Sequence, residues 1–582
     1  MKNKVANLNP ELSNYRELMS FSLNNYKENI AYEYKKDPTA KTPKYIRKTY
    51  KEVVNDVKAL GTALLNLKEK NKISKILLIG SNRYEWVLSY FAITTSGLVV
   101  APMDKLLPSK EIKSLVERSG VEAVICEEKY IEQFKELKQD KSNKLEIVIC
   151  MDNVNDKEVI NLPDLLRNGR KSLKNKDKKY DKVKIDNNAM SIMLFTSGTT
   201  DKSKIVMLSQ KNICSNIWAY QNHFKMREDD VLLSFLPINH TFESSITIVY
   251  GFYCGSCIAF CDGLRHIQQN LVEYKVSIFV AVPLVLETMH KKINKGIEAQ
   301  GKTELINKLM KFSNILLKCH IDIRRKLFKQ IIDQFGGRLR IMLYGAASLD
   351  KDTIKGFNNI GIDSIQGYGL TETSPVLVAE SESRHKPGSC GYPLDNVEIK
   401  ILEPDKQGIG EIAAKGPNVM IGYYEDEAKT KAAFTDDGWF KTGDFGYIDK
   451  DGFLYITGRK KDIIVLRNGK NVYPQELEFL VNKLPYVTES MVFSREESET
   501  DTQLVAKIVY DKDEIAKEYG EKTQEDYKKQ IWKDIKEINK TLPTFKHIKQ
   551  IIITTEPMEK TTTQKVKRYE EIKKAEKEMA NS

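Results

Sequence analysis

The sequence predicts an α/β protein with a large N-terminal part and a smaller C-terminal part. Short apolar runs such as residues 73–80 and 121–126 are bounded by polar turns and separated by stretches with helical spacing, which is typical of strands buried between helices. A chain of 582 residues that is 41% hydrophobic can bury a large core and should divide into at least two domains. Short strands and charged helices begin near Arg459, so we predict one domain over 1–458 and a small domain over 459–582.

Two early segments predict elements of the core. Residues 50–67 predict a helix, because apolar side chains recur there at helical spacing and form one face. Residues 86–103 approach the length of a membrane span, but small polar residues at their centre divide them into a buried helix and a short strand. The residues behind these predictions are Val53, Val57, Leu60, Leu64 and Leu67 on the helix face, and Thr94, Thr95, Ser96 and Gly97 at the centre.

Two basic segments come later. Residues 171–184 hold many lysines and few large apolar side chains, which predicts a solvated connection. Residues 291–335 predict a long helical insertion with one apolar face. Two interpretations of that face stay open: helices packed on the main domain, or a face that lies on a membrane surface. The face comprises Leu316, Ile323, Leu327 and Ile331, beside Arg324, Arg325 and Lys329.

Composition excludes several classes of protein. The net charge is +12, but charged residues make up 30% of the chain, so a mixed, solvated surface is a better interpretation than nucleic-acid binding. The eight cysteines are scattered, which favours a reduced, cytoplasmic protein. Cys254, Cys257 and Cys261 have no fourth ligand nearby in the sequence, so buried thiols are favoured over a metal site. The N-terminus lacks the apolar core of a signal peptide.

The stretch from Leu194 to Ser209 predicts a phosphate-binding loop. Its hydroxyls and backbone N–H groups can surround phosphate oxygens, and Lys204 supplies positive charge. It is not an ordinary P-loop, because Ser203 and Ile205 stand where that motif has its second glycine and its Mg²⁺-binding hydroxyl. The loop residues are Thr196, Ser197, Gly198, Thr199 and Thr200.

Five further motifs follow the loop. They are "YGAASLD" from Tyr344, "QGYGLTETSP" from Gln366, "GWFKTGDFGYID" from Gly438, "ITGRKKDII" from Ile456 and "KTTTQKVKR" from Lys560. In this order and spacing the six motifs closely resemble the signatures of the adenylate-forming superfamily. That superfamily includes acyl- and aryl-CoA synthetases, firefly luciferase and the adenylation domains of nonribosomal peptide synthesis. The resemblance covers most of the chain and implies a large N-terminal adenylate-forming domain of several subdomains, with a small mobile α+β domain after it.

The resemblance implies a reaction in two halves. A carboxylate reacts with ATP to give an acyl-adenylate and pyrophosphate, and the acyl group then passes to a thiol. Charge that develops at the α-phosphate calls for a metal ion and for cations. Glu372 matches the family's Mg²⁺ carboxylate, with Thr196 as a second candidate ligand, and Lys204 serves the phosphates. Lys565 matches the lysine that bridges the carboxylate and the α-phosphate, with Lys567 and Arg568 as alternatives if the register differs.

The same resemblance implies a nucleotide site. Tyr368 offers an aromatic face to adenine, and small residues around Gly345 let the backbone approach the base. Asp444 can accept both ribose hydroxyls, and Arg459 can reach the ribose or a phosphate. The other predicted contacts are Ala346, Ala347, Gln366, Gly367 and Thr371.

Relatives rotate the small domain between the two half-reactions, about a residue that corresponds to Lys461. Rotation withdraws Lys565 and leaves a channel for the pantetheine of CoA at Gly469. Such a domain motion can be part of the turnover cycle. The chain departs from the common loop pattern at Asp201, Ser203 and Ile205. Gln564 replaces a frequent glycine, as in long-chain acyl-CoA synthetases.

The predicted substrate is a fatty acid of medium to long chain. An amino-acid-activating relative would place an aspartate in its pocket, whereas this chain offers His240, Phe242 and Glu243. His240 orients the carboxylate or gates its tunnel, and a packed neutral histidine is an equal interpretation. The insertion at 291–335 resembles that of long-chain synthetases and suits collection of substrate at the inner face of a membrane.

Three functions therefore stay open. The first is a fatty acid–CoA ligase that uses ATP, Mg²⁺ and CoA, and the second is an acyl-AMP ligase or acyl-carrier-protein synthetase. The third is a silent lipid- or nucleotide-binding protein, against which the intact Lys204, Glu372, Asp444 and Lys565 argue. Nucleic-acid binding is disfavoured because no nucleic-acid motif accompanies the diffuse charge.

Overall fold

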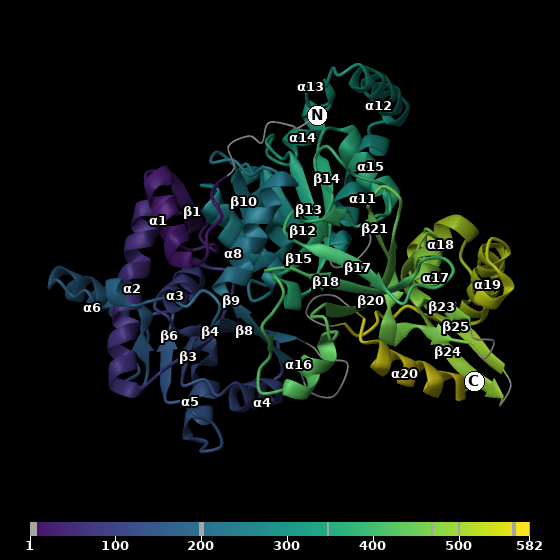
Figure 1. Cartoon of the computed structure of the whole chain (residues 1–582). Coiled ribbons are helices and arrows are strands. Elements are labelled where there is room, and N and C mark those ends of the chain that lie inside the picture. The colour runs from purple at the N-terminus through teal and green to yellow at the C-terminus, as the bar shows by residue number, and fades with distance from the viewer. Residues whose placement is uncertain are drawn as a thin grey trace. The chain divides into compact units, whose positions relative to one another are not determined.

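The computed structural model describes residues 9–196, 203–345, 349–466, 470–498, 501–560 and 566–580. The chain forms two compact units, which are treated separately below. The large unit comprises Met1–Ile399, Ala414–Phe440 and Gly452–Leu454, and the small unit comprises Lys400–Ala413, Lys441–Asp451 and Tyr455–Ser582. Parallel strands with helices between them fill the large unit (Figure 1), so the predicted α/β class is confirmed.

The first sheet of the large unit has eight strands. Its central strands β8, β4, β3, β5, β6 and β7 run parallel, and β9 and β19 add antiparallel at one edge. Leu77, Ile79 and Val124 are fully buried, as expected for parallel strands that are covered on both faces. In spatial order the strands are β19 (Gly422–Tyr423), β9 (Lys204–Ser209), β8 (Met190–Thr196), β4 (Val99–Met103), β3 (Lys75–Ile79), β5 (Ala123–Cys126), β6 (Ile147–Cys150) and β7 (Ile160–Asn161).

The helices that accompany this sheet begin with clear sequence signals. Thr49 and Glu52 form a capping box at the start of the longest one, α2, which satisfies two backbone N–H groups that the helix leaves without partners. The helices are α2 (Tyr50–Asn71), α3 (Tyr84–Thr95), α4 (Ser109–Ser119), α5 (Ile131–Gln139), α6 (Leu162–Lys174) and α7 (Lys179–Lys182).

The second sheet of the large unit has nine strands. The run from β1 to β14 is parallel, and β2, β15 and β16 add antiparallel at the two edges. In spatial order the strands are β16 (Tyr392–Pro393), β15 (Val376–Ala379), β14 (Asp363–Gly369), β13 (Ile341–Tyr344), β12 (Ile278–Ala281), β10 (Val231–Ser234), β11 (Cys257–Phe260), β1 (Ile30–Lys35) and β2 (Tyr45–Thr49).

The remaining helices of the large unit include a nine-residue π-helix, η3 (Phe242–Tyr250). Such turns are rare and occur frequently at functional sites. The others are α1 (Tyr15–Tyr26), α8 (Gln210–Ala219), α9 (Gly251–Tyr253), α10 (Ile267–Glu273), α11 (Pro283–Ala299), α12 (Thr303–Lys318), α13 (Arg324–Leu327), α14 (Lys329–Asp333), α15 (Lys351–Asn359) and α16 (Glu427–Ala433).

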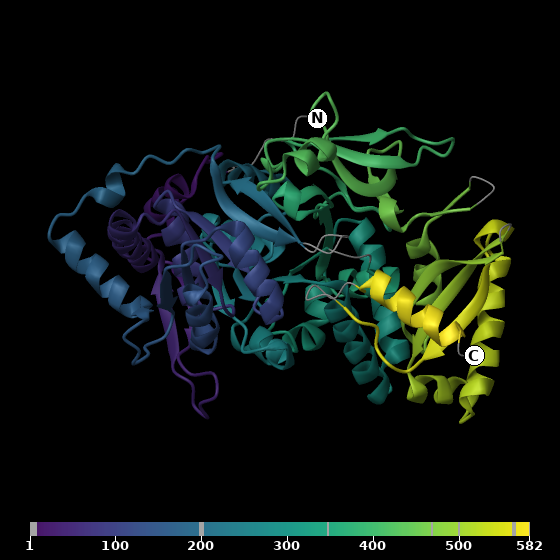
Figure 2. The same cartoon turned by 90° about the horizontal axis from the view of Figure 1, so that it is seen from below.

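The small unit is built on a three-stranded sheet that helices cover on both faces (Figure 2). Alternate residues of β24 and β25 point to opposite sides: Val492 and Ile508 pack with α17 and α19, whereas Met491 and Val509 pack with α20. This alternation follows from the two-residue period of a strand. The elements are β24 (Val487–Ser498), β25 (Asp501–Tyr510), β26 (Ile548–Thr554), α17 (Pro474–Val481), α18 (Lys512–Tyr519), α19 (Gln524–Lys540) and α20 (Arg568–Ala580).

Two smaller sheets complete the fold. A four-stranded sheet lies mainly in the small unit, and a two-stranded ribbon follows it along the chain. The strands are β17 (Glu398–Leu402), β18 (Gly410–Lys415), β20 (Phe440–Ile448) and β21 (Leu454–Arg459), then β22 (Ile464–Val465) and β23 (Asn471–Val472). The domain boundary placed between 458 and 459 stays a prediction.

Two local predictions are confirmed. Residues 86–103 form most of helix α3, which ends at Thr95, and strand β4, with Ser96 and Gly97 between the two elements. Helix α2 buries the predicted face, with Leu67 only partly covered. Among the described residues, no helix combines the length and the apolar character that crossing a membrane requires.

The prediction for residues 171–184 is partly wrong. The segment begins inside α6 and also contains the short helix α7. Tyr180 is buried, and the guanidinium of Arg16 lies 4.2 Å from its ring centroid. One aromatic side chain therefore fixes a stretch whose lysines suggested a solvated connection.

The apolar face predicted over residues 291–335 is also wrong. The segment divides among α11, α12, α13 and α14, so it presents no single continuous helix face. Leu327 and Ile331 pack on the core of the second sheet, as the interpretation of helices packed on the main domain expects. Arg324 Nη1 donates to the carbonyl of Asn358 at 2.7 Å, and Arg325 Nη1 donates to the carbonyl of Leu339 at 2.6 Å. The two arginines therefore tie this segment to the rest of the large unit.

Candidate active site

The predicted phosphate loop connects two strands, and the structure describes these strands. Strands β8 and β9 form an antiparallel hairpin in which Thr196 and Lys204 are direct partners. Ser203 also has fixed contacts, because its hydroxyl donates to Glu111 Oε1 at 2.9 Å and its carbonyl accepts from Arg118 Nη2 at 2.6 Å. Ile205 is buried in the core of the first sheet. Of the residues that depart from the common loop pattern, Ser203 therefore contacts helix α4 and Ile205 packs in the core.

Lys204 and Glu372 meet on the side chain of Tyr423. The ammonium of Lys204 donates to the Tyr423 hydroxyl at 3.3 Å and lies 4.6 Å from the ring centroid. The same hydroxyl donates to Oε1 of Glu372 at 3.0 Å. Strand β19 places Tyr423 because it pairs with β9, opposite Val206. A cation from the loop and a carboxylate from a distant motif are therefore joined through one phenol.

The electrostatics of this cluster keep the phenol neutral. Burial raises the pKa of Tyr423 well above its usual value, and the negative charge and hydrogen bond of Glu372 raise it further. A neutral phenol can donate to the carboxylate and accept from the ammonium at the same time. Tyr423 thus holds Glu372 and Lys204 in a fixed relation without adding charge.

The short 3₁₀ turn η5 (Thr371–Thr373) that carries Glu372 is anchored on both sides. The backbone N–H of Met420 donates to the Glu372 carbonyl at 2.8 Å, and Asn418 Nδ2 donates to the Thr373 carbonyl at 2.9 Å. A side chain at Gly369 would lie 1.8 Å from the carbonyl oxygen of Pro375, so glycine is required where strand and turn meet.

The predicted adenine-binding residues lie at the carboxyl ends of two neighbouring parallel strands. Tyr344 of β13 is in register with Gln366 of β14, and Gly345 follows directly. A Cβ at Gly345 would stand 3.1 Å from the carbonyl oxygen of Gly367, so the backbone there is closely approached. Tyr368 is largely buried. Carboxyl ends of parallel strands are where open α/β sheets bind ligands.

Gln366 has its side chain inside the protein. Its Oε1 accepts from the Tyr344 hydroxyl at 3.3 Å, and its backbone N–H donates to Glu380 Oε2 at 3.3 Å. Burial raises the pKa of Glu380 to about 7. The structure therefore gives Gln366 a packing role at this edge of the sheet, beside the backbone positions predicted to face adenine.

The segment predicted to border the substrate carboxylate leads into the π-helix, which starts at Phe242. His240 is half-buried, and its backbone carbonyl accepts from the Ser244 hydroxyl at 3.0 Å. The ring of Phe242 would lie 3.7 Å from a Cβ at Gly345, so this segment reaches the end of β13. Glu243 is fully buried, which raises its pKa to about 8, and its Oε2 accepts from the Thr247 hydroxyl at 3.0 Å.

The small unit holds Asp444 and Arg459, predicted to bind the nucleotide, and Lys461, the predicted pivot. Asp444 is buried on β20, and Arg459 ends β21 with its Nε 3.6 Å from Asp444 Oδ1. Lys461 lies in the 3₁₀ turn η6 (Lys460–Asp462). Burial lowers the pKa of Lys461, and the nearby Arg459 also lowers it. Asp444 and Arg459 therefore lie next to each other, and their contact with a ribose stays a prediction.

Several predicted site residues lie outside the described residues: Ser197, Gly198, Thr199, Thr200, Ala346, Ala347, Gly469 and Lys565. The two alternatives to Lys565 have partners of their own. Lys567 Nζ lies 2.6 Å from Glu559 Oε1, and Arg568 Nη1 lies 2.6 Å from Glu478 Oε1.

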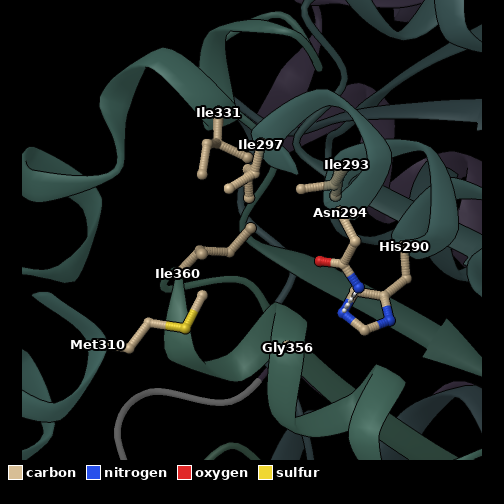
Figure 3. Close-up of a pocket in the computed structure, with 8 residues that line it drawn as sticks. All are labelled: His290, Ile293, Asn294, Ile297, Met310, Ile331, Gly356 and Ile360. Carbon is tan, nitrogen blue, oxygen red and sulfur yellow. Dashed lines mark hydrogen bonds between the residues drawn. The ribbon is translucent and has the colours of Figure 1, made fainter. Parts of the chain in front are cut away.

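A recess in the large unit lies apart from these motifs (Figure 3). It is lined by His290, Ile293, Asn294, Ile297, Met310, Ile331, Gly356 and Ile360. None of these residues belongs to a quoted motif, and the recess has room for about one water molecule. Burial lowers the pKa of His290. The recess is therefore a packing gap under α12 rather than a substrate site.

Sequence reasoning missed Tyr423. No quoted motif contains it, and its partner Glu372 is far away in the sequence. The only local signal is the pair of tyrosines in "IGYYEDE" directly before a charged helix, and that pattern does not reveal pairing with β9.

A phosphate-loop hairpin, a facing carboxylate and small residues at strand ends together define a nucleotide-dependent enzyme. Comparison with known protein families identifies the class of enzyme. Residues 22–424 match the AMP-binding enzyme family and residues 461–581 match the AMP-binding enzyme C-terminal domain. The chain belongs to this family, and so to the adenylate-forming superfamily.

Curated relatives share about a quarter of their residues with this chain. A long-chain-fatty-acid–CoA ligase 5 from Rattus norvegicus is 28% identical over 570 residues, which cover 90% of this chain and 82% of the relative. A fatty acyl-CoA synthetase B from Dictyostelium discoideum is 28% identical, covering 85% and 75%. A chloroplastic long-chain-fatty-acid–[acyl-carrier-protein] ligase from Arabidopsis thaliana is 26% identical, covering 84% and 76%.

Solved structures share the fold. The anthranilate CoA ligase in complex with anthranoyl-AMP superposes with a TM-score of 0.76 at 19% identity, over 98% of this chain and 99% of that chain. The predicted superfamily and its two-part fold are therefore confirmed.

Proposed function

We propose that the protein is an AMP-forming fatty acid–CoA ligase. It activates a fatty acid of medium to long chain with ATP and then transfers the acyl group to CoA. The meeting of Lys204 and Glu372 on Tyr423 carries the proposal, because it places a cation and a carboxylate at the base of the phosphate loop. The long-chain ligases among the relatives support the choice of substrate.

The first half-reaction forms the adenylate. An oxygen of the fatty carboxylate attacks the α-phosphorus of ATP, the bond to the oxygen bridging α- and β-phosphorus breaks, and pyrophosphate leaves with that electron pair. Lys204 and the loop hydroxyls hold the phosphates, and Lys565 neutralises charge on the carboxylate and the α-phosphate. Tyr368 and the backbone at Gly345 receive the adenine.

The second half-reaction forms the thioester. The sulfur of CoA attacks the acyl carbonyl carbon and its thiol proton passes to water. The bond from that carbon to the adenylate oxygen breaks, and AMP leaves with that electron pair. Asp444 and Arg459 hold the ribose. Lys461 is the proposed pivot by which the small domain exchanges Lys565 for the pantetheine channel at Gly469.

The residues present fit a Mg²⁺ ion. Glu372 offers carboxylate oxygens and Thr196 a hydroxyl, which are the hard donors that Mg²⁺ prefers. No cluster of three or more histidine, cysteine or acidic side chains suitable for a metal occurs within the described ranges. One carboxylate is sufficient when nucleotide phosphates supply other ligands. Bound there, Mg²⁺ would neutralise charge on the phosphates.

The substrate end of the site is assigned to the segment from His240 to Glu243. His240, which is half-buried and lies two residues before the π-helix, would orient the fatty carboxylate. The ring of Phe242, within this segment, lies close to Gly345, so the carboxylate and the nucleotide would meet there. We further propose that the enzyme is cytoplasmic and works at the inner face of a membrane.

A carrier-protein acceptor is the second candidate. The Arabidopsis relative is a ligase for acyl carrier protein, and the first half-reaction is the same for both acceptors. A silent lipid- or nucleotide-binding protein would retain no catalysis, although it would bind the same ligands.

The test measures AMP and acyl-CoA made by the purified protein from Mg²⁺-ATP and a panel of fatty acids, with and without CoA. Lys565→Ala should abolish AMP formation, whereas Lys567→Ala, whose lysine pairs with Glu559, should retain it. Removal of Mg²⁺ with a chelator should stop the reaction, and its return should restore it.

Each outcome separates the candidates. CoA-dependent turnover that selects a chain length supports the ligase. Acyl-adenylate that forms but ignores CoA points to acyl carrier protein as acceptor. No AMP from any fatty acid would contradict both.

A further inference from the structure

Helix α12 exposes an apolar stripe that nothing in the described structure covers. Leu305, Phe312 and Ile315 have 54%, 52% and 62% of their surface exposed. The described chain has fifteen strongly exposed large hydrophobic residues, and five of them lie within residues 305–321. Single exposed apolar residues are ordinary, but a concentration of them marks an interaction surface.

The opposite side of helix α12 packs against the large unit. Ile306, Leu309 and Met310 pack on the core of the second sheet, and Figure 3 shows Met310 turned toward the recess beside Ile360. At 100° per residue, Ile315 lies diametrically opposite Ile306. The helix is therefore apolar on two faces, only one of which serves the fold, and it lies at the edge of the large unit (Figure 1).

Positive charge borders the exposed stripe. Lys311 and Lys318 lie four and three residues from Ile315, so they are its neighbours on the helix surface. Across residues 302–329 the sequence has eight lysines and arginines and two acidic residues. Glu304 is paired with Lys308 at 2.7 Å and Asp322 with Arg324 at 2.7 Å, so neither acidic residue offsets Lys311 or Lys318.

We propose that this face, comprising Leu305, Phe312, Ile315, Lys311 and Lys318, docks on the surface of an anionic lipid membrane. An amphipathic helix that lies in the interface buries its apolar stripe at the boundary of headgroups and acyl chains. Lysines at its border attract anionic headgroups and extend their charged ends to the water. The surface deepens the proposed membrane association, but its binding needs neither ATP nor turnover.

The location also suits the proposed substrate. Helix α12 belongs to the same unit as the phosphate hairpin and the segment from His240 to Glu243. A fatty acid partitions into membranes, so a ligase docked by this helix would take its substrate directly from the lipid phase.

The test is flotation of the full-length protein with vesicles, without ATP or fatty acid. Vesicles of phosphatidylcholine mixed with phosphatidylglycerol should bind the protein, and vesicles of phosphatidylcholine alone should bind it weakly. Added salt should weaken binding, because it screens the lysines. Two pairs of substitutions separate the contributions: Phe312→Ser with Ile315→Ser, and Lys311→Glu with Lys318→Glu.

Each pair should lower partitioning by at least about tenfold, given the apolar area removed or the charge reversed. The matched control is Leu106→Ser with Leu264→Ser, which removes two residues that are 65% and 71% exposed elsewhere. It should leave partitioning unchanged. Thermal unfolding of each variant confirms that the fold persists.

The proposal is overturned if anionic vesicles do not bind the protein, or if the α12 variants bind as well as the control. It is also overturned if sedimentation shows a dimer that the α12 substitutions dissociate while vesicles bind nothing, because the stripe would then cover a second copy. Retained fatty acid–CoA ligase activity in detergent would show that a failure here leaves the proposed reaction intact.

Discussion

The Tyr423 hydroxyl donates to Glu372 Oε1 at 3.0 Å and accepts from Lys204 Nζ at 3.3 Å. Removing the hydroxyl should release both groups while the ring remains packed. A hydrogen bond to a charged group contributes about 1.5–3 kcal/mol, so Tyr423→Phe should lower kcat/KM for adenylation by about tenfold to a hundredfold. ATP–pyrophosphate exchange measures this effect.

Tyr424→Phe is the control for that change. The neighbouring hydroxyl accepts from Lys75 at 3.0 Å and touches neither Glu372 nor Lys204, so exchange should stay near the wild-type rate. Equal losses in both variants would show that Tyr423 acts only through packing.

Burial of Glu243 should make stability depend on pH. Its pKa is raised from 4.5 to about 8 by burial, so the folded state favours the protonated acid. The protonated Glu243 therefore contributes fully to the free energy of unfolding below about pH 4.5. That contribution is lost as the pH rises through 8, and the free energy of unfolding falls by up to about 1.4 kcal/mol per pH unit.

Glu243→Gln mimics the protonated acid and removes this dependence. Urea unfolding of the large unit should therefore show that the variant gains stability over the wild type as the pH rises from about 5 to about 8. Parallel profiles for the two proteins would contradict the buried-acid assignment.

Gly345 lacks room for a side chain. A Cβ there would lie 3.1 Å from the Gly367 carbonyl, so Gly345→Ala should push apart the ends of β13 and β14 and raise the KM for ATP several-fold. Gly296→Ala is the matched control, because nothing lies within 4 Å of a Cβ at that helical position. It should stabilise α11 by up to about 1 kcal/mol. Thermal unfolding and ATP titration of both variants measure these effects.

A buried ion pair fixes helix α20 in the small unit. Lys507 Nζ lies 3.1 Å from Glu571 Oε2, with both side chains almost fully buried. Lys507→Met would leave Oε2 of this buried carboxylate without its cation, although Oε1 keeps Lys574 Nζ at 2.8 Å and the backbone N–H of Glu559 at 3.1 Å. The free energy of unfolding of the small unit should therefore fall by about 3 kcal/mol. Lys507→Met combined with Glu571→Met should recover most of this loss. Denaturant unfolding of the single and double variants decides whether the two residues are coupled.

The sequence predicted the parts of the fold that depend on local pattern. Apolar spacing identified α2, and the polar interruption after Ile93 separated α3 from β4. The same reasoning failed at Tyr180, because a single buried aromatic among lysines does not change the pattern. It also failed at Arg324 and Arg325, whose backbone partners lie on other elements.

For the site, motif resemblance selected Lys204, Glu372, Asp444 and Arg459, and the structure brings Asp444 and Arg459 into contact. Tyr423 could not be found in this way, because strand pairing between β19 and β9 brings it to Glu372. The buried state of Glu243 likewise depends on the packing of the π-helix, which no local pattern reveals.

In the β8–β9 hairpin, the two paired strands have a different role from the phosphate loop that connects them. Thr196 and Lys204 face each other across the ladder, so their spacing is set by strand pairing and not by the residues between them. Ile205 fills the core as part of these paired strands, so a glycine there would leave a void. A substitution among residues 197–202 should therefore change phosphate binding without moving the backbone positions of Thr196 and Lys204.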